Sequence, residues 1–134
     1  MKRWEFFSEQ ELSCRGTDEC EMNEEFMEKL VRLRKKFNKP MIISSGFRSQ
    51  AHNSAINGAR HSPHLLGRAV DILCHGKDAY RLIGLAIDNG MTGIGVQQRG
   101  DYESRFIHVD DVVNSKVHHR PGYGLINDRD NSQR

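Results

Sequence analysis

The sequence predicts an α+β fold in which helices flank an antiparallel sheet. Helical and strand-like segments do not alternate strictly along the chain, which argues against a doubly wound parallel sheet. The segments 93–97 and 105–112 also look like two strands joined by a polar turn at 99–101, and the strands of such a hairpin are antiparallel neighbours. A chain of 134 residues is expected to form one domain, large enough to bury a core without disulfides.

The first long helix is expected at residues 22–37, where apolar residues recur at steps of three and four. Asn23 is a suitable N-cap, because its side chain can accept a hydrogen bond from a free N–H group of the first turn. Pro40 prevents the helix from continuing. The apolar positions of the predicted buried face are Met22, Phe26, Leu30, Leu33 and Phe37.

The remaining elements are shorter and follow in sequence order. Gly90 is expected to end the second long helix, because glycine readily takes the left-handed conformation that closes a helix. After about Asn114 the chain turns polar, and we expect a partly ordered tail within the single domain 1–134. The expected elements are a strand at 41–45, a short helix at about 50–57, a loop at 58–63, a strand at 69–74 and a helix at 77–89.

The composition excludes several classes of function. The chain has 20 Lys and Arg against 18 Asp and Glu, and a net charge of +2 is too small to predict a nucleic-acid partner. No apolar run approaches the roughly 18 residues of a membrane helix, so no membrane insertion is expected. The start, MKRWEFFSEQELSC, lacks the apolar segment of a signal peptide. We therefore expect a protein that stays in the cytosol or leaves it by a route not written in this sequence. The small size and near-neutral charge suggest a domain that stands alone, and a monomer is expected.

The cysteines are Cys14, Cys20 and Cys74, and an odd count argues against a full disulfide framework. Reduced thiols are the expected state in a chain without an export signal. The alternatives are a disulfide between Cys14 and Cys20, or a structural metal that both help to bind.

Two residues of the kind that binds metals lie inside apolar, strand-like segments. Asp71 stands between Val70 and Ile72, so the two-residue period of a strand turns its side chain away from both. A carboxylate buried there without a partner costs roughly several kcal/mol, and a cation would remove that cost. His108 stands in the same way between apolar neighbours in the segment FIHVD.

His64 completes a possible ligand set. If it lies in the loop before the strand of Asp71, a separation of seven residues lets both side chains converge on one point. Together with His108, these two residues leave a fourth tetrahedral position for water, as catalytic zinc requires. The pKa of such a water is lowered toward neutrality, and the water can act as a nucleophile. The competing interpretation is that the histidines are hydrogen-bonded core residues without a metal.

Several short blocks of the sequence also stand in a characteristic order between about Phe7 and Val112. They are SGFRS (45–49), HN (52–53), GA (58–59), SPHLLGRAVD (62–71), GIG (93–95) and FIHVD (106–110). This pattern resembles the zinc D-Ala-D-Ala carboxypeptidase family, part of the superfamily that includes lysostaphin-type enzymes and the Hedgehog signalling domain. The family signature S-x-H-x-x-G-x-A-x-D is matched in full by Ser62, His64, Gly67, Ala69 and Asp71.

The resemblance implies a Hedgehog/D,D-peptidase-like fold in which the three predicted ligands bind Zn²⁺. It also implies that Arg48 binds the substrate carbonyl or carboxylate and stabilises the oxyanion, whereas the alternative role is a loop-bracing salt bridge. Ser62 is expected to form a hydrogen bond to the substrate or to a ligand. His52 and Asn53 are expected to order the loop or to orient other groups of the site.

The general base is not where the family places it. Many relatives carry an acid three positions before the last histidine ligand, and others carry a histidine two positions before it. Many relatives in the shorter branch of the family lack the acid at that position. Here those positions hold Arg105 and Phe106, and neither side chain can act as the base. Glu103 is the expected base, with Asp101 and Asp110 as alternatives. Asp110 would face the same side as the last histidine ligand and could instead orient its imidazole.

The expected function is zinc-dependent hydrolysis of peptidoglycan stem peptides, as in bacterial and bacteriophage enzymes. The enzyme would be either a D,D-carboxypeptidase or an L-Ala-D-Glu-type endopeptidase. The missing acid motivates one alternative, a catalytically impaired module that binds the cell wall, and a structural phage protein is another. The substrate lies at the cell wall or in the periplasm. A phage lysin released through a membrane pore, or a trimmed leader, would reconcile that location with the absent signal peptide.

Overall fold

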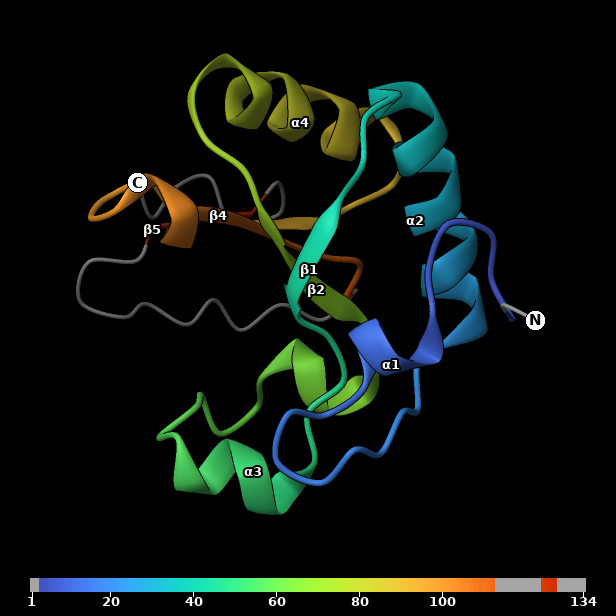
Figure 1. The fold of residues 1–134 in the computed structure, drawn as a ribbon, viewed down its shortest axis with the longest axis vertical. Helices are drawn as coiled ribbons and strands as arrows, with labels where there is room; N and C mark the ends of the chain where they lie inside the picture. Colours follow the sequence, from blue (N-terminus) through green and yellow to red (C-terminus); the bar gives the residue numbers. More distant parts are fainter. Residues whose placement is uncertain (1–2, 113–123, 128–134) are drawn as a thin grey trace.

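The computed structural model describes residues 3–112 and 124–127, and its centre is a five-stranded sheet (Figure 1). The strand order is β1-β2-β4-β3-β5, and every neighbouring pair is antiparallel. The α+β prediction is therefore confirmed. The strands are β1 (Ile42–Ser45), β2 (Ala69–Leu73), β3 (Gly93–Gln97), β4 (Phe106–Asp110) and β5 (Gly124–Asn127).

The helices agree with the sequence prediction at the three places where one was expected. The helices expected at 22–37, 50–57 and 77–89 are α2 (Glu24–Phe37), α3 (Gln50–Ala55) and α4 (Gly76–Asp88). Four elements were not predicted. They are α1 (Glu9–Leu12), the 3₁₀ helices η1 (Pro63–Leu66) and η2 (Tyr102–Ser104), and β5.

The strand β5 lies in the stretch after Asn114 where the sequence suggests a polar tail. It pairs with β3, and its residue Leu125 stands opposite Gly95. Apart from residues 124–127, that stretch lies outside the described part of the chain.

The long helix α2 begins and ends at the residues that the sequence indicates. The Asn23 side chain accepts a hydrogen bond from the backbone N–H of Phe26 at 2.9 Å, so it caps the helix as predicted. Asn38 closes the helix in the left-handed conformation, with φ 57°. The carboxylates of Glu24 and Glu25 lie in the first turn, where the positive end of the helix dipole stabilises them.

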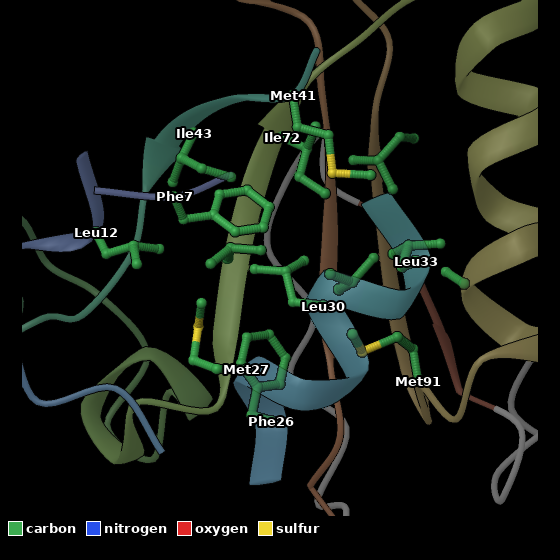
Figure 2. Close-up of a cluster of buried hydrophobic side chains, with 14 of the residues drawn as sticks. Phe7, Leu12, Phe26, Met27, Leu30, Leu33, Met41, Ile43, Ile72 and Met91 are labelled. Atoms are coloured by element: carbon green, nitrogen blue, oxygen red, sulfur yellow. The ribbon is translucent and has the colours of Figure 1, made fainter. Parts of the chain in front are cut away.

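The hydrophobic core fills the space between one face of the sheet and the helices. Figure 2 shows Phe26 and Leu30 of α2 in the same cluster as Ile43 and Ile72 of the sheet, with Phe7 beside Ile43. The core side chains of β2 and β4, such as Ile72 and Ile107, are no more than 1% exposed. Because alternate residues of a strand face opposite sides, the residues between these apolar ones point to the other face of the sheet.

A buried carboxylate ties α2 to two segments of the sheet. The Asp111 side chain is fully buried and accepts hydrogen bonds from Arg68 Nε at 2.9 Å and Arg68 Nη2 at 3.0 Å. Lys29 of α2 donates to the same carboxylate at 2.9 Å. Arg68 directly precedes β2 and Asp111 directly follows β4, so this cluster holds the ends of both strands against α2.

Two other expectations concern thiols and membranes. Cys14, Cys20 and Cys74 are free thiols, so the alternative of a disulfide between Cys14 and Cys20 is not formed. Among the helices of residues 3–112, none combines the length and the apolar character needed to cross a bilayer.

The Asp111→Ala substitution should destabilise the fold by about 3–5 kcal/mol, because it leaves two cations buried or half-buried without their carboxylate. Chemical denaturation measures this loss. The matched control is Glu25→Gln, which removes an exposed carboxylate from the same Arg68 and should change stability little. Equal effects of the two substitutions would contradict the structural role assigned to Asp111.

Candidate metal centre

Three buried side chains from separate elements converge on one point. His64 comes from η1, Asp71 from β2 and His108 from β4, and they are 3%, 8% and 5% exposed. The Asp71 Oδ1 atom lies 3.3 Å from His64 Nε2 and 2.9 Å from His108 Nδ1. One donor atom from each residue lies within 4.8 Å of the other two, so a single ion could contact all three.

The register of the sheet brings Asp71 and His108 together. The two residues stand directly opposite each other in the β2–β4 ladder. Val70 and Ile72, on either side of Asp71, are buried in the core on the opposite face. Directly opposed residues of an antiparallel pair have their Cβ atoms about 4.5–5.5 Å apart, which suits a shared ligand. The alternation argument from the sequence therefore describes the strand correctly.

His64 lies in a 3₁₀ helix rather than in the loop that the sequence suggests. The Ser62 hydroxyl caps this helix by accepting a hydrogen bond from the His64 backbone N–H at 3.3 Å. Gly67 closes it with φ 66°, and a side chain there would overlap the carbonyl oxygen of Glu21. Ser62 is only 3% exposed, and its hydroxyl is used in this cap. Its contact with substrate stays a prediction.

Each histidine has its outer ring nitrogen engaged by an acceptor. His64 Nδ1 lies 2.8 Å from the carbonyl oxygen of Gly46, and His108 Nε2 lies 2.8 Å from Asp110 Oδ2. A carbonyl only accepts, so His64 carries its proton on Nδ1 and turns the lone pair of Nε2 toward Asp71. In a neutral His108, the same logic turns the Nδ1 lone pair toward Asp71 as well.

This donor set fits a divalent cation. With both imidazoles neutral, two nitrogen lone pairs and a carboxylate oxygen face one another in a buried space, and a cation relieves that repulsion. Nitrogen and carboxylate oxygen donors in a two-histidine, one-carboxylate set are typical of catalytic zinc sites. His64, Asp71 and His108 would hold the ion, and Gly46 and Asp110 would hold the two rings in position.

Without a metal, a proton partly takes the place of the cation. Burial lowers the pKa of His108, but hydrogen bonds to Asp110 and Asp71 outweigh it and raise that pKa to about 9. Burial lowers the pKa of His64, although the nearby Asp71 charge opposes the change. Burial acts to raise the pKa of Asp71, but the neighbouring His64 and His108 keep it well below its usual range. At neutral pH the metal-free site therefore holds its extra proton on His108.

Asp110 acts on the ring of His108 from the side away from the shared point. Its Oδ2 is engaged by His108 Nε2, and its Oδ1 accepts a hydrogen bond from the backbone N–H of Val112 at 3.2 Å. Its carboxylate packs against Gly93, where a Cβ atom would overlap it. The sequence left two roles open for Asp110, general base and orienting residue. This geometry favours the orienting role.

Arg48 lies beside this group, whereas Glu103 does not contact it. The Arg48 backbone N–H donates to the carbonyl oxygen of His64 at 3.1 Å, and the side chain is 6% exposed. Glu103 is exposed in η2. In the described ranges 3–112 and 124–127, no hydrogen bond or ion pair joins Glu103 to the three converging residues. Its role as general base stays a prediction, as does that of Asp101.

Sequence reasoning missed the contribution of Gly46. Its carbonyl oxygen determines which nitrogen of His64 is available to a metal. Every residue has a backbone carbonyl, so no residue type could signal this role. Its place in the SGFRS block was the only available hint.

An antiparallel sheet that carries a buried pair of histidines and a carboxylate is the kind of arrangement that metal-dependent hydrolases use. The family model described as Peptidase M15 matches residues 1–110, a range that contains all three converging residues. The chain therefore belongs to the Peptidase M15 family, whose members are metallopeptidases. A comparison with curated proteins finds no significant match.

The Asp110→Ala substitution should weaken zinc binding by about 10- to 100-fold, because His108 loses the acceptor that orients its ring. Competition with a chromophoric chelator measures the affinity. Glu103→Ala is the control, since that exposed carboxylate has no hydrogen bond or ion pair to the three residues within the described part of the chain. Its loss should leave the affinity unchanged. An unaltered affinity in Asp110→Ala would rule out the orienting role.

Zinc binding should release about one proton at about pH 6, because the metal displaces the proton of His108, whose pKa is about 9 in the free protein. Since the proton competes with the metal below that pKa, the apparent affinity should rise about tenfold per pH unit and level off as pH passes 9. Calorimetry in buffers of different ionisation enthalpy gives the proton count. An affinity that stays constant between about pH 6 and 8 is the contrary result.

Proposed function

We propose that this protein is a zinc-dependent peptidase that hydrolyses peptidoglycan peptides. The observation that carries the proposal is the buried convergence of His64, Asp71 and His108, with the outer nitrogen of each imidazole already engaged. Membership of the Peptidase M15 family supports a metallopeptidase. The identity of the ion and of the substrate are the parts that we propose.

The metal-binding residues and Arg48 have separate tasks in this proposal. His64, Asp71 and His108 hold the ion, and Asp110 keeps the His108 ring aligned. Bound zinc would supply a Lewis acid that polarises the scissile carbonyl and lowers the pKa of the attacking water. Arg48 binds the carbonyl oxygen or a terminal carboxylate of the peptide, because its planar fork matches both groups and its charge favours a developing oxyanion.

The proposed substrates are stem or cross-bridge peptides of peptidoglycan. Cleavage would follow either the D,D-carboxypeptidase or the L-Ala-D-Glu-type endopeptidase pattern. The proposed place of action is the cell wall or the periplasm, where a monomeric enzyme of the phage lysin type would meet its substrate. Glu103 is the proposed proton acceptor, and substrate binding would have to bring it close to the attacking water.

A second candidate is a zinc-containing module that binds the cell wall without cutting it. Two observations favour it. Glu103 is exposed and has no contact with the metal-binding residues in the described part of the chain. Arg105 and Phe106 occupy the positions at which relatives carry their base. The two candidates share the metal and differ in turnover.

Purified protein should contain about one zinc per chain and should release muropeptide fragments from purified peptidoglycan. His64→Ala and Asp71→Ala should lose both the metal and all product, because each removes a ligand. Elemental analysis identifies the ion, which is needed because the same ligand set also binds non-haem iron. Mass spectrometry of the fragments identifies the bond.

His75→Ala is the matched control, since His75 is an exposed histidine whose ring packs at a tilt against Tyr102 and is not one of the three converging residues. It should keep its zinc and its activity. Full cleavage after chelation of the metal would overturn the proposed zinc dependence. Zinc content with wall binding and no product would select the second candidate.

A further inference from the structure

Arg48 is a buried cation whose backbone is tied to the metal centre. Its N–H group donates to the carbonyl oxygen of His64, and the preceding Phe47 N–H donates to Leu12 at 2.8 Å. These bonds place the Cα of Arg48 but not its guanidinium, because a long side chain keeps several rotamers unless other contacts select one. The direction of the charge therefore depends on the partners of the guanidinium.

Two neutral side chains orient the guanidinium. Arg48 Nη1 donates to Asn53 Oδ1 at 3.0 Å, and Nη2 donates to Ser45 Oγ at 3.2 Å. Because these bonds involve both terminal nitrogens, they fix the plane of the fork. Neither Asn53 nor Ser45 carries a charge, so these two contacts orient the guanidinium without themselves neutralising it.

Asn53 is itself held in one orientation. It is 1% exposed within α3, and its Nδ2 donates to the carbonyl oxygen of Ala59 at 2.9 Å. Its backbone carbonyl also accepts from the N–H of Gly58 at 2.8 Å. Since the amide donor is used by Ala59, the amide oxygen is the atom that faces Arg48. An aspartate could not make both contacts, because it lacks the donor.

Gly58 lies so close to Asn53 that no side chain fits at this position. A Cβ atom on Gly58 would overlap Asn53 Oδ1 and would lie 3.1 Å from Arg48 Nη1. Both of these groups are buried and hydrogen-bonded, so neither can move aside freely. The absence of a side chain at Gly58 therefore allows the contact between Asn53 and Arg48 to form.

We propose that Asn53 is a positioning residue that aims the Arg48 guanidinium at the substrate, and that Gly58 is needed for this role. The proposal rests on the proposed function of Arg48 in substrate binding. Asn53 acts through Arg48 and not through the metal, so its removal should leave zinc binding intact. This separates its role from that of Asp110, which acts on a metal ligand.

A double-mutant cycle tests this coupling. Asn53→Ala should lower kcat/KM about 10- to 100-fold while zinc content stays at that of the wild type. In an Arg48→Ala background, Asn53→Ala should cause no further loss, because the residue through which it acts is gone. Additive losses in the two backgrounds would overturn the proposal, and so would a loss of zinc in Asn53→Ala.

Two further variants keep the test independent of the cavity that alanine creates. Gly58→Ala leaves Asn53 in the chain but displaces its amide, so it should reproduce the loss seen in Asn53→Ala. Asn53→Asp keeps the shape and places a negative charge on Arg48, so it should mainly raise KM. Ser54→Ala, a change on the exposed side of the same helix, is the control and should alter neither parameter.

A measurement without substrate separates this proposal from the proposed function. In protein labelled with ¹⁵N-arginine, a guanidinium held at both terminal nitrogens rotates slowly and gives distinct NMR signals. Arg48→Lys identifies which signals belong to Arg48. These signals should be distinct in the wild type and should merge in Asn53→Ala and Gly58→Ala. Unchanged signals would overturn the proposal, whereas an inactive wild type with this signal change would count against the proposed function alone.

Discussion

The pairing of Asp71 with His108 across β2 and β4 is the constraint on which the rest of the site depends. The two residues share the face of the sheet opposite to Val70, Ile72 and Ile107, which pack under α2. A slip of one residue in this ladder would turn the shifted strand over, so that its polar side chain would enter the core and leave the other without its partner. The apolar face therefore enforces the register that keeps the polar residues together. The same register of β2 and β4 is therefore needed for a stable core and for the geometry of the candidate metal centre.

The electrostatics of the centre follow from how its outer atoms are used. Gly46 and Asp110 engage the outer nitrogens of the two histidines, so the remaining lone pairs have nowhere to point except toward Asp71. Three buried acceptors in one place would repel one another without a positive charge between them. A proton on His108 meets this need in part, and a divalent ion meets it for all three donors at once. The same contacts thus orient the ligands and create the demand for a cation.

Several features of the site favour a hydrolytic enzyme, and one does not. Three candidate ligands converge and the chain belongs to a metallopeptidase family. Arg48 lies beside His64, and the neutral side chains of Asn53 and Ser45 accept hydrogen bonds from its guanidinium. Arg105 stands at the position where the sequence resemblance implies an acid, three residues before His108. The residues proposed to bind the metal and the substrate are therefore better defined than the residue that would transfer the proton. For this reason turnover, and not metal content, separates the two candidate functions.

The sequence by itself determined the features that depend on neighbouring residues. The period of apolar residues and the cap at Asn23 are local, and they located α2. Alternation along a strand is also local, so it placed Asp71 and His108 on the face away from the core. The order of short blocks indicated a zinc peptidase family, and the match over residues 1–110 confirms the Peptidase M15 family. The D-Ala-D-Ala carboxypeptidase subtype stays a prediction.

Only the tertiary structure decided which of these residues meet. The strand order places β4 beside β2, and no local pattern encodes that choice because it depends on hydrogen bonds between distant segments. The strand β5 pairs with β3 by the same kind of bond, which the polar composition of its surroundings does not signal. The carbonyl of Gly46 and the amide of Asn53 act through their position alone. Their roles exist only once the chain has brought His64 and Arg48 within reach of them.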